Sequence, residues 1–120
     1  MPFLSLKTNQ HLTDQVKIDL KTLFGQAIRT IPGKSEENLM VMFEAQSSIF
    51  LKGNEVPVAL VKMDIFGVPQ HQGYSDLAQA VTFTIHEVLD IPLENIYIDF
   101  YDIKSWSVAG YYMEDGYADT

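Results

Sequence analysis

One stretch of the sequence occurs twice at a constant offset of 57 positions, as Glu37-Asn38-Leu39-Met40-Val41-Met42-Phe43 and as Glu94-Asn95-Ile96-Tyr97-Ile98-Asp99-Phe100. Each copy contains an apolar, β-favouring run too short for a helix, which predicts a strand, and we expect the strand at residues 39–43 to be buried. An Ile-Pro pair precedes each copy at nearly the same phase, Ile31-Pro32 in the first half and Ile91-Pro92 in the second. The repeat indicates an internal duplication.

The residues before each copy have first a strand pattern and then a helix pattern. Residues 3–8 and 56–65 predict strands. Thr13 is the expected N-cap of the first helix, and Ser75-Asp76 is the expected cap of the second. Apolar residues recur at spacings of three and four in both helices, at Val16, Leu20, Leu23, Phe24, Ala27, Ile28 and Ile31 and at Leu77, Val81, Ile85, Val88 and Leu89. After the second copy, the aromatic residues around Trp106 fit no independent helix.

Strand, helix and strand therefore follow one another twice. We expect a single domain of residues 1–120, with pseudo-repeats at about residues 2–51 and 56–108. Right-handed crossovers make each half a parallel pair of strands, and joining the halves in one sheet puts both helices on the same side. The predicted fold is α+β, with two βαβ repeats that form a four-stranded sheet with two helices on one face.

The other face of this sheet must meet water or a partner. In the last long strand, Tyr97 and Asp99 alternate with apolar residues, so their face is too polar for a core covered by helices. We expect four leucines to add apolar surface to that face, namely Leu4, Leu6, Leu39 and Leu60. Sheet faces that are half apolar often pack on other subunits, so the pattern predicts an oligomer.

The composition argues against several classes of protein. The net charge is −8, and the seven lysines and one arginine are scattered, which argues against a nucleic-acid partner or an anionic membrane surface. The absence of cysteine excludes disulfides and thiolate sites. His11, His71 and His86 lack metal-ligand spacing, and we expect neither a metal nor a cofactor. Because no apolar segment reaches transmembrane length, we expect a cytoplasmic protein, with non-classical secretion left open.

The first residues offer the most distinctive chemistry. Met1 precedes a residue as small as proline, so we expect it to be removed, which would leave Pro2 with a free secondary amine. An α-amino group has a pKa near ~7.7 to 8, and burial beside apolar side chains lowers it because burial disfavours the charged form. A strand that starts at Phe3 without a polar leader would hold this amine out of water. Many chains begin with Met-Pro and have no such role, so the dipeptide alone leaves both interpretations open.

Together these features resemble the tautomerase superfamily, and within it the macrophage migration inhibitory factor branch. The resemblance rests on Met1-Pro2, on the two βαβ halves, on Gly33-Lys34 after the first helix, and on the order in which they occur. Similarity runs over almost the whole chain, and further matching stretches are Pro57-Val58-Ala59-Leu60, Phe66-Gly67, Tyr74-Ser75 and Ile96-Tyr97-Ile98-Asp99-Phe100-Tyr101-Asp102.

The resemblance implies a homotrimer with three active sites at the subunit boundaries. It implies that Pro2 is the catalytic base, which shuttles a proton between the enol oxygen and the carbon of a small 2-keto acid such as phenylpyruvate. Lys34 matches the lysine that holds the substrate carboxylate, and Phe66 matches the position whose backbone N–H does the same. Tyr97 matches the tyrosine that the neighbouring subunit supplies.

Some residues depart from the family pattern. Asp99 stands where a family member has an asparagine in the substrate pocket, and its carboxylate would repel an anion or accept a hydrogen bond from a hydroxylated substrate. Asn38 replaces an aromatic residue of the pocket wall, for which Tyr111 or Tyr112 could substitute. Arg29 is the single arginine and lies within the first helix, which argues against the dehalogenases and hydratases of the family, because those enzymes use arginine pairs.

Each candidate site residue also has a purely structural interpretation. Lys34 could be a solvated cation near a helix C-terminus, Tyr97 could pack across strands, and Glu36-Glu37 could be a solvated loop pair. Two hypotheses follow from the sequence. The first is an isomerase, a keto-enol tautomerase of the phenylpyruvate type, and the second is a catalytically idle trimer that binds a protein partner, as the cytokine members of the branch do.

Overall fold

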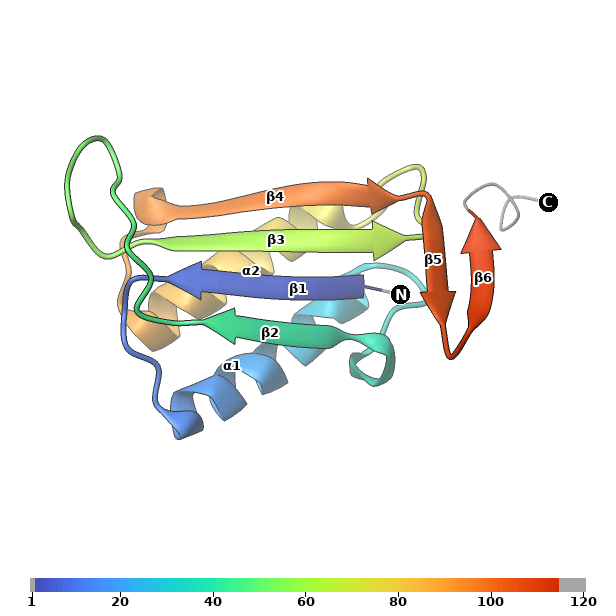
Figure 1. Ribbon diagram of the computed structural model, residues 1–120, viewed down its shortest axis with the longest axis horizontal. Coiled ribbons are helices and arrows are strands. Elements are labelled where there is room, and N and C mark those ends of the chain that lie inside the picture. The colour runs from blue at the N-terminus through green and yellow to red at the C-terminus, as the bar shows by residue number, and fades with distance from the viewer. Residues whose placement is uncertain (1, 115–120) are drawn as a thin grey trace.

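The two halves of the duplication fold alike and join through their first strands (Figure 1). In the computed structural model, which describes residues 2–114, β1 (Pro2–Thr8) pairs in parallel with β2 (Met40–Glu44), and β3 (Ala59–Phe66) pairs in parallel with β4 (Ile96–Ile103). β1 and β3 run antiparallel in the middle of the sheet, which gives the order β2-β1-β3-β4.

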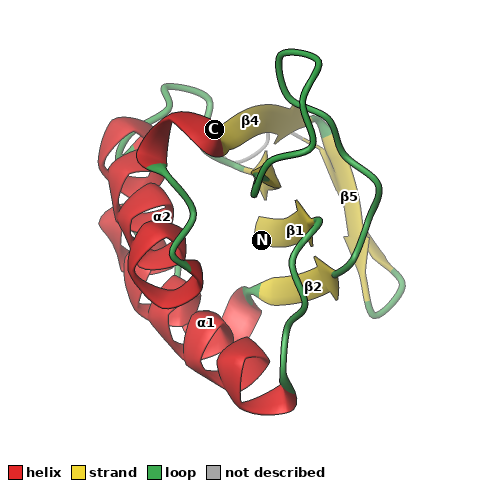
Figure 2. Ribbon diagram, turned by 90° about the vertical axis from the view of Figure 1, so that its left-hand side faces the viewer, coloured by secondary structure: helices red, strands yellow, loops and turns green. Residues whose placement is uncertain are grey.

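Two helices, α1 (Asp14–Ala27) and α2 (Tyr74–Leu89), both lie on one face of the sheet (Figure 2). The predicted α+β architecture is therefore confirmed. Residues 2–114 also contain three short 3-10 helices, namely Ile28–Thr30, Glu36–Asn38 and Leu93–Asn95. Neither α-helix of the described chain has the length and apolarity that a membrane span requires.

The duplication extends to the register of strand pairing. Phe3 lies opposite Met40 in the first half, and Leu60 lies opposite Tyr97 in the second, which is the same pairing shifted by 57 positions. The prediction that residues 39–43 form a buried strand is wrong. β2 is an edge strand, and Met40 and Met42 are exposed because only one face of the strand packs beneath α1.

The core lies between the sheet and the helices. Leu4 and Leu6 are fully buried there, opposite Met63 and Val61 of β3, and the helices contribute residues such as Phe24. The expectation that Leu4 and Leu6 add apolar surface to the open face is wrong, because the alternation of side chains along β1 places both on the helix side. Leu39 also packs against the core. Of the four leucines expected on the open face, Leu60 is therefore the one that lies there.

The two helices begin in different ways. Thr13 caps α1 as predicted, since its hydroxyl accepts a 3.1 Å hydrogen bond from the backbone N–H of Val16. The predicted Ser75-Asp76 cap of α2 is wrong. The N-cap of α2 is Gly73, whose φ is +83°. Glycine adopts this left-handed conformation readily, whereas residues with a side chain are strained in it.

The third strand is shorter at its start than predicted. Residues 56–58 are held by side chains instead of by strand pairing, because the Asn9 amide group donates to the Val56 carbonyl and accepts from the Val58 N–H. In the loop between β2 and β3, Leu51 and Asn54 form an isolated antiparallel bridge. The aromatic segment after β4 forms a hairpin of β5 (Ser105–Val108) and β6 (Tyr111–Glu114), which stands across the end of the sheet where β1 begins (Figure 1).

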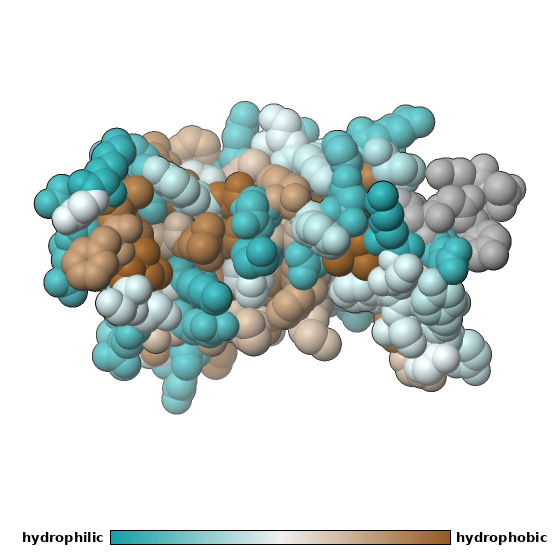
Figure 3. Space-filling model, turned by 45° about the horizontal axis from the view of Figure 1, so that its top comes forward, coloured by the Kyte–Doolittle hydropathy of each residue, from teal (hydrophilic) through white to brown (hydrophobic). Residues whose placement is uncertain are grey.

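No element of the described chain covers the face of the sheet opposite the helices. Tyr97 and Tyr101 are 50% and 62% exposed on this face, and Lys62 and Asp99 form an ion pair across it, with 3.7 Å between Nζ and Oδ2. Figure 3 shows apolar patches lying between hydrophilic side chains at the surface. The face is therefore mixed in polarity, as expected from the alternation in β4.

We predict that Gly73→Ala destabilises the fold by about 2–5 kcal/mol, because the new methyl group would meet the carbonyl of Thr30 in addition to the strain of a left-handed backbone. Gly53→Ala is the matched control, since Gly53 also has a positive φ, of +79°, but nothing lies within 4 Å of the added group. The control should lose about 1 kcal/mol. Urea denaturation of both variants at equal protein concentration gives the two values, and equal losses would show that the close approach to Thr30 is unimportant.

Candidate active site

Pro2 is buried at the start of β1, opposite Ile65 of β3. A hollow of about 420 Å³ opens beside it, and most of the surface that lines it is apolar. The walls come from the start of β1, from the segment that leads into β2, and from β5; the lining residues are Pro2, Phe3, Glu37, Asn38, Leu39, Met40, Trp106 and Val108. A small, mainly apolar hollow with a few polar groups is typical of a site for a small molecule.

Lys34 is held at the same end of the sheet. Its ammonium group donates a 3.0 Å hydrogen bond to the backbone carbonyl of Phe66, which directly follows Ile65, the residue opposite Pro2. An ammonium group has three donors, so the bond to Phe66 leaves capacity for a ligand. The antiparallel pairing of β1 with β3 therefore places the contact between Lys34 and Phe66 at the end of the sheet where Pro2 lies, although neither residue is part of the lining of the hollow.

Tyr97 and Asp99, both in β4, lie away from Pro2 in the folded chain. Tyr97 is opposite Leu60, and Asp99 is opposite Lys62, on the uncovered face of the sheet. Ile65 lies opposite Pro2, five residues along β3 from Leu60 and three from Lys62. At about 3.3 Å per residue, Tyr97 is therefore roughly 17 Å and Asp99 roughly 10 Å from the level of Pro2 along the strands. Within one chain they do not join the Pro2 hollow, so their participation remains a prediction that requires a second subunit.

Tyr97 instead borders a second hollow, of about 160 Å³. Six of its eight lining residues correspond to residues of the Pro2 hollow at the offset of 57 positions: Ala59 to Pro2, Leu60 to Phe3, Asn95 to Asn38, Tyr97 to Met40, Ile49 to Trp106 and Leu51 to Val108. The duplication has therefore produced two related hollows at opposite ends of the sheet.

Two residues in the lining of the Pro2 hollow, Glu37 and Trp106, are not predicted from the sequence. Glu37 was interpreted as part of a solvated loop pair, yet it lines the hollow while remaining exposed. Trp106 supplies the aromatic wall that Tyr111 or Tyr112 was suggested to provide, whereas both tyrosines are exposed and neither lines the hollow. The internal repeat contains a signal for Trp106, because Trp106 and Val108 lie 57 positions after the apolar residues Ile49 and Leu51 and therefore belong to the repeated unit.

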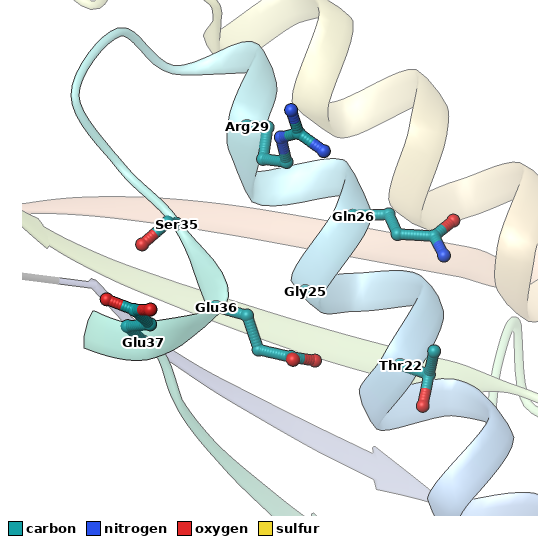
Figure 4. A pocket seen from close by; sticks show the side chains of 7 residues that line it. All are labelled: Thr22, Gly25, Gln26, Arg29, Ser35, Glu36 and Glu37. Atoms are coloured by element: carbon teal, nitrogen blue, oxygen red, sulfur yellow. The ribbon is translucent and has the colours of Figure 1, made fainter.

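A larger and more polar hollow, of about 510 Å³, lies between α1 and the segment around Glu36 (Figure 4). The Glu36 side chain extends along α1 and lies against Gly25, where a methyl group would collide with it. Arg29 forms no ion pair with a described residue. This hollow lacks the buried proline and the apolar walls of the Pro2 hollow, so the latter is the better candidate for chemistry.

His71 has a structural contact outside the hollow. Its Nε2 lies 2.6 Å from a carboxylate oxygen of Asp102, and its ring stacks on Tyr74 with 4.8 Å between ring centroids. Tyr74 also donates to Asp102 at 3.2 Å. Within residues 2–114, no group of three His, Cys, Asp or Glu residues is arranged to hold a metal ion.

Comparison with known proteins places the chain in a family. No curated protein matches it, but solved structures do: MIF2 of Leishmania major aligns with a TM-score of 0.87 and 26% identity over 94% of this chain and 97% of that one. A homologue of macrophage migration inhibitory factor from Prochlorococcus marinus, 20% identical, aligns with a TM-score of 0.78 over 92% of this chain and 97% of that one. A fused 4-OT protein described as an asymmetric trimer, also 20% identical, gives 0.79 over 91% and 94%. The family model of macrophage migration inhibitory factor (MIF) matches residues 1–112, and the chain therefore belongs to the MIF family.

Proposed function

We propose that the protein is a keto-enol tautomerase in which Pro2, after removal of Met1, acts as the general acid and base on a small 2-keto acid. Met1 lies outside the described residues, so its removal is part of the proposal. The observation that carries the proposal is the burial of Pro2 beside a mainly apolar hollow. Burial favours the neutral amine by lowering its pKa, and a neutral amine near pH 7 can accept a proton from carbon.

The reaction needs one proton to move between two atoms of the substrate. The Pro2 nitrogen takes the proton from the carbon next to the keto group and returns it to the keto oxygen, which yields the enol. Lys34 supports this step by binding the substrate carboxylate with its remaining donors, and the backbone N–H of Phe66 is the proposed second donor to the carboxylate. Fixing the anion in this way holds the reacting carbon near the base.

Tyr97 and Asp99 complete the site from a neighbouring subunit in this proposal. Both residues are exposed on the uncovered face of the sheet and are remote from Pro2 along the strands of their own chain, so only a second copy could bring them to the hollow. We therefore propose a homotrimer. Exposed apolar and aromatic residues of this face and of β2, such as Met40 at 68% exposure and Tyr101, provide surface for the contact.

Replacing Pro2 tests the chemistry directly. Pro2→Ala should lower the rate of phenylpyruvate keto-enol exchange by about a hundredfold or more, because it removes the secondary amine from the site. A chain that carries one extra residue before Pro2 is the matched control for geometry: it keeps the ring but converts the nitrogen to an amide without a basic lone pair, so it should also be inactive. Intact-mass measurement must first show that Met1 is absent. A wild-type protein with a free Pro2 and no activity above buffer would refute the enzyme proposal.

Removal of the Lys34 charge should weaken substrate binding. We expect Lys34→Gln to raise KM for phenylpyruvate by about ten- to a hundredfold, since a hydrogen bond to a charged partner is lost. Lys21→Gln removes the same charge from an exposed position on α1 and should leave KM unchanged. Steady-state kinetics give KM for both variants. An equal rise of KM in the two would show that the overall charge of the protein, and not a contact of Lys34 with the substrate, determines binding.

The subunit arrangement has its own test. Size-exclusion chromatography with light scattering at micromolar concentration should give three times the chain mass of 13.6 kDa. A monomer would contradict the trimer and, with it, the roles proposed for Tyr97 and Asp99.

A further inference from the structure

The outer face of α2, on the side away from the sheet, has an exposed apolar patch (Figure 2). Phe83 is 52% exposed there, and Leu93, in the 3-10 helix that follows α2, is 40% exposed. Between them opens a hollow of about 300 Å³ whose walls are almost entirely apolar, and its lining residues are Ala78, Gln79, Thr82, Phe83 and Leu93. The hollow shares no residue with the one beside Pro2.

Acidic side chains continue this face along the helix in both directions. Asp76, Phe83, Glu87 and Asp90 are separated by seven, four and three positions, so they form one stripe along α2, and all four are exposed. Glu94 is also exposed, in the 3-10 helix that follows α2. None of these four carboxylates forms an ion pair within the part of the chain that the structure describes. Their charges are therefore available to a partner.

The sequence supplies no cation to balance them. Between Lys62 and Lys104 there is no lysine or arginine, but there are seven acidic residues, namely Asp64, Asp76, Glu87, Asp90, Glu94, Asp99 and Asp102. His86, the histidine of α2, is held by a 2.8 Å hydrogen bond between its Nδ1 and the carbonyl of Ile91. An uncompensated row of carboxylates gives the face a negative potential, which attracts positively charged partners.

We infer that the outer face of α2 binds a basic amphipathic helix of a partner protein. An apolar side chain of that helix fills the hollow lined by Phe83 and Leu93, and its lysines or arginines meet the carboxylates on either side. A helix bordered by a hollow suits a second helix, because the side-chain ridges of one helix pack into the grooves of another. The carboxylates would repel an anionic membrane or a nucleic acid.

This role goes beyond the proposed tautomerase activity and does not depend on it. The proposed trimer uses the uncovered face of the sheet and β2, whereas α2 lies on the other side of the sheet (Figure 2). The outer face of α2 therefore remains accessible in the trimer, and a partner can bind there without entering the Pro2 hollow.

The probe is a synthetic peptide of about 14 residues, made of leucine and lysine, whose leucines share one face when the peptide is helical. A helix of about 14 residues is about 21 Å long, which matches the stripe from Asp76 to Asp90. An isomer with the same residues in scrambled order keeps the charge and loses the apolar face. Surface plasmon resonance should show that the amphipathic peptide binds about tenfold more tightly, because the isomer cannot bury its leucines together on Phe83.

Phe83→Ser should weaken binding of the amphipathic peptide by about tenfold or more, mainly through faster dissociation. This variant keeps the net charge of −8, so a general attraction between an acidic protein and a cationic peptide would not change. Ile18→Ser is the matched control, because Ile18 is also 52% exposed, on α1, but has both Asp14 and Lys21 as helical neighbours. The control should bind the peptide like the wild type, and circular dichroism verifies that both variants are folded.

A second variant tests the charges and leaves Phe83 in place. Glu87→Gln combined with Asp90→Asn should slow association and weaken the dependence of affinity on salt concentration, since charges at the rim of an interface act mainly on the rate of association. Asp14→Asn combined with Asp19→Asn removes the same charge from α1 and should have little effect.

Several results would overturn the inference: equal binding of the two peptides, no binding at about millimolar concentration, unchanged binding by Phe83→Ser, or equal losses in a variant and its matched control. A molecular mass that rises with protein concentration in the wild type but not in Phe83→Ser would identify a second copy of the chain as the occupant, and would also overturn it. None of these results bears on the proposed chemistry of Pro2, because no residue of this face lines that hollow.

Discussion

The structure depends on the position of β1, which is bonded along both of its edges. Its parallel partner β2 and its antiparallel partner β3 hold seven residues that begin at Pro2 itself. Chain ends are usually loose because nothing pairs with them. Here the first residue of the strand is buried, and the remainder of the strand is anchored by Leu4 and Leu6, which have almost no exposed surface.

The features of the candidate site follow from this central strand. The antiparallel pairing with β3 sets the end of that strand beside Pro2, and the Phe66 carbonyl there holds Lys34. The hairpin after β4 then adds Trp106 and Val108 to the lining of the hollow. One end of the sheet thus combines a buried proline, a lysine held by a backbone carbonyl and an aromatic wall, although the residues involved come from distant parts of the sequence.

Much of the fold could be predicted from the sequence because duplication and alternation both leave periodic patterns. The offset of 57 positions identified the two halves, and the actual strand pairing keeps that offset residue by residue. The errors occurred where local patterns are ambiguous. An apolar run such as residues 39–43 does not reveal whether it is central or at an edge, and a glycine that replaces a polar cap, as Gly73 does at α2, has no side-chain signal.

The candidate site was predictable only in part. Pro2 and Lys34 stand out through their chemistry and their positions, whereas Glu37 and Trp106 become neighbours of Pro2 only after the chain has folded. Residue type alone could not reveal this, because a glutamate in a loop and a tryptophan near the end of a chain are usually unremarkable. Tyr97 and Asp99 are remote from Pro2 within their own chain, so the role proposed for them depends on a second subunit.

The pair of related hollows has a consequence for how such a protein can diverge. Copying a coding sequence in tandem copies every wall of a cavity, but a polypeptide has a single amino terminus. Ala59, the counterpart of Pro2, is joined to the preceding residue by a peptide bond, and the lone pair of its nitrogen is delocalised into the carbonyl group. The second cavity therefore cannot contain a free amino-terminal nitrogen at this position, and its residues, Tyr97 among them, can take other roles, such as the contact with a neighbouring subunit proposed above.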